Sequence, residues 1–272
     1  MSLSSRVIAI TGASSGIGRA CAERLAADGA AIVIAARRIE RLHEIAETTR
    51  ARGGRVHVVQ ADVTRPDDMR ALVAGAVDTF GRLDVMICNA GVGYYGALDD
   101  TPPHAMQRLV EVNVLGTMYA ASAALPVFRR QGSGHVIAMC SISGRRGVGG
   151  ASVYSATKAA QIGLIEALRA EFAGTKIHAS LIYPVTVSTE FREVHRREYG
   201  REVEAAGPRQ TPESVAAMVA GCIAHPAPEV YPFRRVWWLA VSGVVAPAWT
   251  DRFVRRYERR VVSRSSDGDA RS

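Results

Sequence analysis

Short apolar runs and helical patterns alternate along the chain. The runs are continuously apolar and rich in β-branched residues, which is typical of parallel strands covered on both faces. They are Val7–Thr11, Ala31–Ala36, Val56–Ala61, Val85–Asn89, His135–Ser141 and Ile177–Tyr183. Between them, apolar residues recur at helical spacing over Ile17–Asp28, Glu40–Arg52, Asp67–Phe80, Pro103–Arg130 and Ser152–Ala173. The pattern predicts an α/β fold of the Rossmann type, with a doubly wound parallel sheet between two helical layers.

Glycine and proline mark the ends of the predicted helices. Asp28-Gly29 and Gly53-Gly54 stand where two helical patterns stop, and Thr211-Pro212-Glu213 begins a further one. No internal repeat divides the chain, and its 272 residues fit a single α/β domain. We therefore expect one domain over residues 1–225, an apolar and basic extension over 226–262 that packs on it, and a disordered polar tail over 263–272.

Composition narrows the class of protein. Hydrophobic residues make up 48% of the chain, which excludes a disordered protein. The cysteines lie far apart without a CxxC pair, so we expect them to be small buried residues in a reducing compartment: Cys21, Cys88, Cys140 and Cys222. The histidines are scattered, and no metal site is predicted. The residues before the first strand fit no signal or transit peptide, so a cytoplasmic location is expected.

Basic residues exceed acidic ones by 34 to 26, and most of the excess lies near the C-terminus. Between Arg234 and Arg264 there are eight arginines against two acidic residues. This region has no nucleic-acid recognition motif, so no nucleic-acid partner is predicted. Only two of the basic residues are lysines, Lys158 and Lys176, which suggests that a retained lysine does something that a guanidinium cannot do.

The first predicted strand runs into the glycine-rich segment TGASSGIG at residues 11–18. Gly12, Gly16 and Gly18 free the backbone for a tight turn and for close approach of a pyrophosphate. The helix that follows offers unpaired N–H groups at its N-terminus. Such a loop after the first strand of a βαβ unit is typical of dinucleotide binding, with an ordinary glycine turn as the alternative.

The end of the second strand bears on the choice of dinucleotide. NAD sites place an Asp or Glu there, roughly 20 residues past the loop, to bond the ribose 2′-hydroxyl. Here the sequence reads Ala35-Ala36-Arg37-Arg38. Arg37 can bond a 2′-phosphate in a fork, and Ser14 or Ser15 can complete the pocket. The sequence therefore predicts a preference for NADP(H) over NAD(H), unless Arg37 is only the solvated start of the next helix.

Tyr154 and Lys158 lie four residues apart in a predicted helix and therefore share one face. A tyrosine has a pKa of about 10 in water, which is too high for easy proton exchange at neutral pH. An ammonium beside it favours the phenolate and lowers that pKa, which suits general acid–base catalysis. The pair is common by chance when it stands alone, and far less so beside a glycine loop.

Together, these motifs resemble the short-chain dehydrogenase/reductase family in its single-domain branch. The resemblance covers the chain from Ser5 to Ala224 and includes the spacing of Ser141 before Tyr154. It rests on TGASSGIG at 11–18, Asp62-Val63, Asn89-Ala90-Gly91, Asn113, Ser141, Tyr154-x-x-x-Lys158 and Pro184-x-x-Val187-x-Thr189. The family implies hydride transfer between a nicotinamide cofactor and a carbonyl or alcohol.

The resemblance implies a role for each matching residue. Tyr154 would protonate a carbonyl, or act as base when an alcohol is oxidised, and Lys158 would lower its pKa and bond the nicotinamide ribose. Ser141 would bond the substrate oxygen, and Asn113 would fix a water that links Lys158 to solvent. The other matches are implied in cofactor binding: Gly12, Ser14, Ser15, Gly16, Ile17 and Gly18 in the loop, Asp62 and Val63 at the adenine, Asn89, Ala90 and Gly91 along the floor, and Val187 and Thr189 at the carboxamide.

Two positions depart from the family pattern. Val185 stands where the family usually has glycine, which puts the shape of the nicotinamide pocket in doubt. Cys88 stands where the family often has asparagine, and a cysteine in a strand is expected to pack rather than react. Ser143 lies near Ser141 without the required spacing and is interpreted as loop structure.

The expected substrate is a ketone or secondary alcohol on a largely apolar body. Its pocket is predicted from residues 93–95, 142–149, 185 and 190–207, with an apolar wall and an arginine-rich lid. The wall is assigned to Tyr94, Ile142, Val148 and Phe191, and the lid to Arg192, Arg196 and Arg197. Three alternatives stay open: an NAD-dependent alcohol dehydrogenase of the same family, a nucleotide-binding sensor without turnover, and a nucleic-acid binder.

Two further expectations concern surfaces. Small residues recur along the helix that carries Tyr154, at Ala156, Ala160, Gly163 and Ala167, and the resemblance implies a homodimer or homotetramer built on this helix and Pro103–Arg130. The alternative is that the stripe packs on its own sheet. The apolar run Val236–Trp249, followed by arginines 252, 255, 256, 259 and 260, either packs on the fold and caps the pocket, or contacts a membrane surface through residues 236–260.

Overall fold

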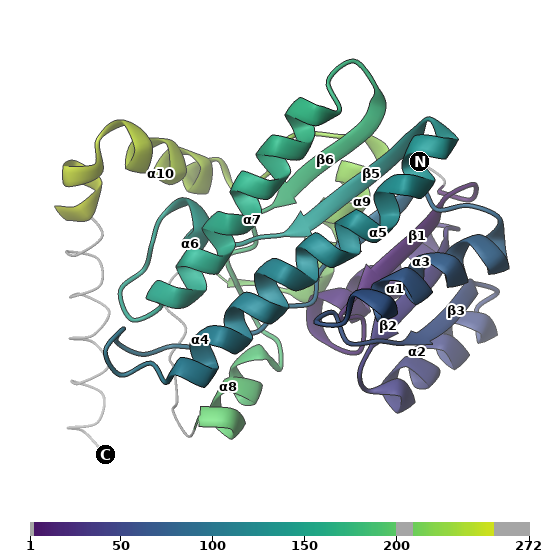
Figure 1. Cartoon of the computed structure of the whole chain (residues 1–272), viewed down its shortest axis with the longest axis horizontal. Helices are drawn as coiled ribbons and strands as arrows, with labels where there is room; N and C mark the ends of the chain where they lie inside the picture. Colours follow the sequence, from purple (N-terminus) through teal and green to yellow (C-terminus); the bar gives the residue numbers. More distant parts are fainter. Residues whose placement is uncertain (1–2, 200–208, 253–272) are drawn as a thin grey trace.

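The computed structural model describes residues 3–199 and 209–252, and within them seven parallel strands form the central sheet (Figure 1). Their order is β3-β2-β1-β4-β5-β6-β9. They are β1 Val7–Thr11, β2 Ala31–Ala36, β3 Arg55–Gln60, β4 Val85–Cys88, β5 Ser133–Met139, β6 Lys176–Ile182 and β9 Glu229–Val230. All neighbouring strands run in parallel, which confirms the predicted doubly wound fold.

Two apolar cores fill the two faces of the sheet, because successive residues of a strand point to opposite sides. In β1, Val7 and Ala9 join one core while Ile8 and Ile10 join the other. One core is covered by α3 Pro66–Phe80, α5 Gly116–Gln131 and α7 Ser152–Glu171. The other is covered by α1 Gly16–Ala27, α2 Ile39–Ala51 and α9 Pro212–Ala224. The six predicted strands and the helix ends at Gly29, Gly53 and Thr211 agree with the structure to within two residues.

Four short elements lie around the sheet and its helical layers. The helices are α6 Ile142–Arg145 and α8 Phe191–Tyr199. A small parallel ladder joins β7 Thr186–Val187 to β8 Arg209–Gln210. The strand β9 follows α9 and extends the main sheet beside β6, so the sheet draws its last strand from the region beyond residue 225.

The helix predicted over Pro103–Arg130 is divided in the structure. A π-helical turn, η1 Val110–Leu115, separates α4 Pro103–Leu109 from α5. Among the described residues, Pro103–Gln131 has the length and hydropathy of a membrane-spanning helix, but Ala124 and Phe128 within it are buried against the sheet. A wider turn inside a helix frequently marks a functional position, and here it carries Asn113.

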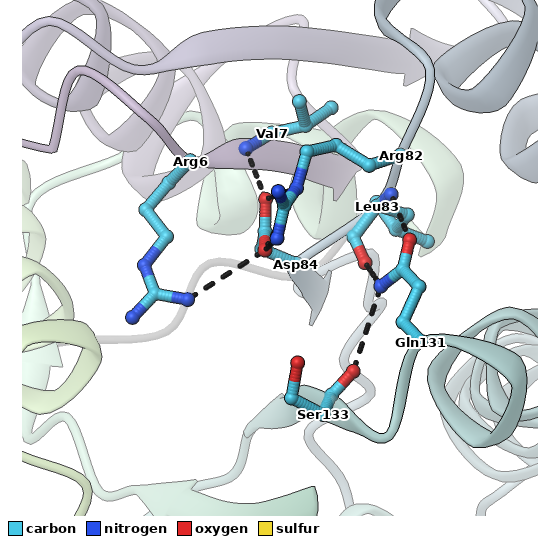
Figure 2. Close-up of polar contacts among 7 residues, drawn as sticks. All are labelled: Arg6, Val7, Arg82, Leu83, Asp84, Gln131 and Ser133. Carbon is cyan, nitrogen blue, oxygen red and sulfur yellow. Dashed lines mark hydrogen bonds and ion pairs between the residues drawn. The ribbon is translucent and has the colours of Figure 1, made fainter.

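The amino end of the sheet is held by the buried carboxylate of Asp84 (Figure 2). Asp84 Oδ2 accepts a hydrogen bond of 2.8 Å from the N–H of Val7, and the carboxylate pairs with Arg82. Beside it, the amide of Gln131 accepts from the N–H of Leu83 at 3.1 Å and donates to its carbonyl at 2.6 Å. These contacts join the starts of β1 and β4 to the end of α5, and they leave the carboxyl end of the sheet for a binding site.

The helix α10 Arg234–Val245 packs beside α6 at one end of the molecule (Figure 1). Val236 is buried, while Trp237 and Trp238 are 42% and 59% exposed. The helix runs through Gly243 and breaks at Ala246, just before Pro247. Arginines 255, 256, 259 and 260 and the tail 263–272 lie outside the described residues, and membrane contact by this segment stays a prediction.

Candidate functional site

The glycine-rich loop between β1 and α1 is held tightly against the end of β4. Gly12 has a φ of +66°, and a Cβ on it would lie 2.8 Å from Ala90 Cα. A Cβ on Gly18 would lie 2.3 Å from the Gly12 carbonyl oxygen. Asn89 Nδ2 donates to the carbonyl oxygens of Thr11 and Gly12 at 2.9 and 3.2 Å. The backbone at these positions has space for glycine alone, as close approach to a pyrophosphate requires.

A basic side chain from the start of α2 lies on the first turn of α1. Ser15, at the N-cap, makes no capping hydrogen bond, and its hydroxyl instead accepts one from Arg38 Nη2 at 2.9 Å. Arg38 also donates to Ser14 Oγ, through Nε at 3.3 Å and Nη2 at 3.1 Å. The side chain of Arg37, predicted for this place, is exposed. Arg38, the N-cap of α2, is the residue whose side chain reaches the loop.

The segment after β7 covers the loop from the other side. A Cβ on Gly16 would lie 3.0 Å from Thr189 Cγ2, so Thr189 rests on the loop. A surface cavity of about 530 Å³ lies here, and its wall includes Gly16, Ser188, Thr189 and Pro212. The N–H of Val185 donates to the side chain of Gln210 at 3.1 Å, which fixes the backbone at this departure from the family pattern. The bare loop, the uncapped helix and the adjoining cavity fit a dinucleotide phosphate.

The other residues predicted to touch the cofactor follow the carboxyl ends of the strands. The carboxylate of Asp62 accepts from the N–H and hydroxyl of Thr64 at 3.0 and 2.9 Å. Val63 lies against Gly116, where a Cβ would be 2.8 Å from Val63 Cγ2. Ile17 and Val187 are partly buried on the second core. The adenine and carboxamide roles of these residues stay predictions.

Ser141, Tyr154 and Lys158 come together at the carboxyl end of β5. Ser141 is the N-cap of α6, and its hydroxyl accepts from the N–H of Ser143 at 3.2 Å. Lys158 Nζ lies 5.7 Å from the centre of the Tyr154 ring, as their spacing on α7 predicts. Burial and the neighbouring Tyr95 raise the pKa of Tyr154, whereas a hydrogen bond with Ser141 acts to lower it. The pKa of Tyr154 is therefore raised in this structure, and not lowered by Lys158 as the spacing on the helix predicted, so the phenol keeps its proton at neutral pH.

The ammonium of Lys158 is buried, with 4% of the residue exposed. Its Nζ donates to the Met139 carbonyl oxygen at 2.8 Å and to Gln161 Oε1 at 3.0 Å. Burial lowers the pKa of Lys158 to about 8. Gly91 lies close by, since a Cβ on it would be 3.8 Å from Nζ. The lysine is thus held compactly between β5, the end of β4 and α7.

Gln161 connects Lys158 to Asn113, and the sequence interpretation missed it. Gln161 Nε2 donates to the Asn113 carbonyl oxygen at 2.9 Å and to Thr117 Oγ1 at 2.7 Å, while its Oε1 accepts from Lys158. The water that the family resemblance implies at Asn113 stays a prediction. The signal available in the sequence was a polar residue three positions after Lys158. In the structure it lies on the helix face that also buries Ile162.

The side chain of Asn113 has a separate bracing role. Its Oδ1 accepts from the N–H of Val92 at 2.8 Å, and its Nδ2 donates to the Val92 carbonyl oxygen at 2.9 Å. The same Nδ2 reaches Thr157 Oγ1 at 3.0 Å. Asn113 therefore ties the π-helical turn to the segment after β4 and to α7, which fixes the walls around Lys158.

Aromatic rings lie beside Tyr154, on the side where the sequence predicted the substrate pocket. The Phe191 ring lies 6.0 Å from the Tyr154 ring, and a Cβ on Gly93 would be 2.4 Å from Phe191 Cε1. Tyr95 is the second neighbour, at 6.3 Å from Tyr154. Tyr94, predicted for the apolar wall, is instead buried and packs edge-on against Tyr199 of α8 at 4.9 Å. Tyr95 and Phe191 are thus the rings beside Tyr154, and the roles of Ile142 and Val148 in the wall stay predictions.

All four cysteines are buried, as predicted. Burial raises the pKa of Cys88 to about 12 and that of Cys140 to about 11. Both thiols therefore stay protonated at neutral pH, and Cys88 packs in the core rather than offering a nucleophile.

Comparison with known proteins decides the family. The family model described as short chain dehydrogenase matches residues 6–200. The chain belongs to the short-chain dehydrogenase/reductase family. An uncharacterized oxidoreductase of Listeria monocytogenes is 37% identical over 231 residues, which cover 83% of this chain and 93% of that protein. This membership makes the chain an oxidoreductase.

Solved structures of other short-chain dehydrogenases share the fold. One from Burkholderia phymatum, in complex with NAD, has a TM-score of 0.78 and 26% identity, covering 86% of this chain and 91% of that one. A variant of the actinorhodin polyketide ketoreductase with NADPH has a TM-score of 0.75 and 30% identity, covering 82% and 92%. One of these neighbours is in complex with NAD and the other with NADPH, so the preference of this short-chain dehydrogenase has to be argued from its own residues.

Proposed function

We propose that the protein is an NADP(H)-dependent reductase of a ketone or aldehyde on a largely apolar substrate, or catalyses the reverse oxidation of the alcohol. The observation that carries this proposal is the cluster of Ser141, Tyr154 and Lys158 beside the glycine loop. Tyr154 holds its proton at Oη, and Ser141 offers a hydroxyl where negative charge develops on the substrate oxygen. Tyr95 and Phe191 supply the apolar surface.

Each residue of the cluster has one task in this mechanism. A bound nicotinamide dinucleotide supplies or accepts the hydride. Tyr154 donates its proton to the carbonyl oxygen in reduction, and takes a proton from the alcohol in oxidation. The ammonium of Lys158 stabilises the phenolate that Tyr154 becomes, a task that suits a compact charge better than a guanidinium.

Replacing Tyr154 by phenylalanine tests the mechanism, because the ring is kept and the transferable proton is lost. We expect kcat with NADPH and a hydrophobic ketone to fall by about 10²–10⁴-fold, the usual contribution of general acid catalysis. NADPH affinity should change less than about twofold. Tyr119→Phe on α5 is the matched control, since Tyr119 packs against the first core. Full activity in Tyr154→Phe would contradict the proposed acid, and NADPH binding without turnover on any ketone would favour the sensor.

The preference for NADP(H) is supported by the guanidinium of Arg38 on the loop serines. A planar guanidinium fork matches a phosphate, and neither Ala35 nor Ala36 can bond a ribose hydroxyl as NAD sites do. Arg37, next to it, remains a second candidate for the 2′-phosphate. The kcat/KM values for NADPH and NADH measure this preference, and a higher value for NADH would favour the NAD-dependent alternative. An electrophoretic shift assay at two salt concentrations tests the nucleic-acid alternative.

We also propose a homodimer or homotetramer in the cytoplasm. The small residues of α7 are exposed rather than packed on the sheet, including Ala156, Ala160, Gly163 and Ala167. Met118 on α5 is also exposed. A smooth helix surface of this kind permits close helix contact. Light scattering that finds only a 29.1 kDa species would contradict the oligomer.

A further inference from the structure

A carboxylate from the segment after β7 lies on the two arginines that follow β2. Glu190 Oε1 and Oε2 accept from Arg41 Nη1 at 2.6 and 2.8 Å, and Oε2 accepts from Arg38 Nη1 at 3.1 Å. The remaining donors of Arg38 hold Ser14 and Ser15. The guanidinium of Arg38 therefore bridges the glycine loop to Glu190, and its donors are already divided between them.

The surrounding cavity carries a net positive charge. It has a volume of about 470 Å³ and is lined by Arg38, Arg41, Glu190, Glu193, Arg196 and Arg197. Four cations thus face two carboxylates. Hydrogen bonds from Arg41 and Arg38 hold the pKa of Glu190 below its usual range, so its carboxylate is charged at neutral pH. Such a cavity attracts an anion, but the guanidinium groups of Arg38 and Arg41 are already paired with the carboxylate of Glu190.

We propose that Glu190 is a cofactor-selectivity residue: its carboxylate competes with the 2′-phosphate of NADP(H) for Arg38 and Arg41. The inference rests on the proposed function, in which a dinucleotide binds over the glycine loop. NADP(H) must displace the carboxylate from at least one guanidinium, whereas NAD(H) leaves both ion pairs in place. When Glu190 moves away, the guanidinium of Arg41 is released from its ion pair and becomes a second ligand of the 2′-phosphate. The natural preference for NADP(H) is then smaller than the arginines alone would give.

The expected effect is moderate, because the partners are exposed. The side chains of Arg38, Arg41 and Glu190 are 39%, 42% and 37% exposed. Two ion pairs of this kind change an affinity by roughly five- to tenfold. Glu190→Gln keeps the size of the side chain and removes its charge, and Glu190→Asp keeps the charge but shortens the reach by one methylene. Glu193→Gln removes a carboxylate from the same cavity wall and is the matched control for a general change of charge.

Calorimetric binding of four probes to the full chain tests the inference: NADPH, NADH, 2′,5′-ADP and 5′-AMP. In Glu190→Gln, affinities for NADPH and 2′,5′-ADP should rise roughly five- to tenfold, while those for NADH and 5′-AMP change less than twofold. Glu190→Asp should lie between this variant and the wild type. Glu193→Gln should raise the 2′-phosphate affinities less than threefold. The Glu190→Gln gain should shrink at high salt.

The possible outcomes separate this inference from the proposed function. If wild-type protein prefers NADH but Glu190→Gln still gains affinity for the 2′-phosphate probes, the NADP(H) preference fails and the role of Glu190 stands. The role of Glu190 would be overturned if Glu190→Gln left the ratio of NADPH to NADH affinity unchanged. It would also be overturned if Glu193→Gln raised the affinity for NADPH and 2′,5′-ADP as much as Glu190→Gln does. A fall in NADH affinity would overturn it too, because the carboxylate would then be bonding the ribose hydroxyl. Wild-type protein that binds none of the four probes overturns both.

Discussion

Gln161 offers a sharp test of how the buried lysine is held. Its Oε1 accepts from Lys158 Nζ at 3.0 Å, and its Nε2 donates to Asn113 and Thr117. Replacing it by methionine keeps an unbranched side chain of similar length and removes all three hydrogen bonds. The charged form of Lys158 loses one of its two described acceptors, and the Met139 carbonyl oxygen remains. The variant therefore lowers the pKa of Lys158.

The size of the shift follows from the hydrogen bond. A hydrogen bond to a charged group contributes about 1.5–3 kcal/mol. Since one pKa unit equals about 1.4 kcal/mol, the pKa of Lys158 should fall by roughly 1–2 units. It starts from about 8 in the wild type. The ammonium is the form that supports Tyr154, and it is lost as the pH rises through this pKa. The basic limb of kcat/KM should therefore move to lower pH by roughly 1–2 units.

The assay is kcat/KM for NADPH-linked ketone reduction across roughly pH 5.5 to 9.5. Gln161→Glu supplies the opposite perturbation, because a carboxylate beside Lys158 raises its pKa and moves the basic limb upward. Gln107→Met is the control, since Gln107 is exposed on α4. If both Gln161 variants lose activity while the basic limb stays at its wild-type pH, Gln161 has only a packing role and the reasoning is refuted.

Two further variants test the fold and the loop. Burial lowers the pKa of His135 to about 3. Below pH 6.5 this histidine is therefore protonated in the unfolded chain but stays neutral in the folded chain. The free energy of unfolding should therefore fall by about 1.6 kcal/mol between pH 6.5 and 5, because the histidine of the unfolded chain is already half protonated at pH 6.5, and His135→Gln should reduce this fall in urea titrations at the two pH values. In Gly18→Ala, the Cβ would lie 2.3 Å from the Gly12 carbonyl oxygen. NADPH affinity should fall at least tenfold and the melting temperature should fall as well, because the new Cβ meets backbone atoms, and unaltered affinity would exclude close packing of this loop.

The sequence alone determined the fold and the position of most of the site. Continuous apolar strands require a sheet buried on both faces, and parallel strands bring their carboxyl ends to one edge. The glycine loop, Ser141 and the Tyr154–Lys158 pair follow those ends or lie on the next helix, so local spacing placed them correctly. Local rules suffice here because the hydrogen bonds of helices and strands fix spacing within each element.

Contacts between distant segments were decided by the tertiary structure. The sequence predicted Arg37 for the 2′-phosphate and did not predict that Arg38, at the turn into α2, lies on Ser14 and Ser15. Glu190 reaches Arg38 and Arg41 from about 150 residues further along the chain. Gln161 meets the carbonyl oxygen of Asn113 inside a π-helical turn, which interrupts a helix that periodicity shows as continuous. Such contacts depend on how separately formed elements pack against one another, and the spacing of residues within one element does not predict that packing.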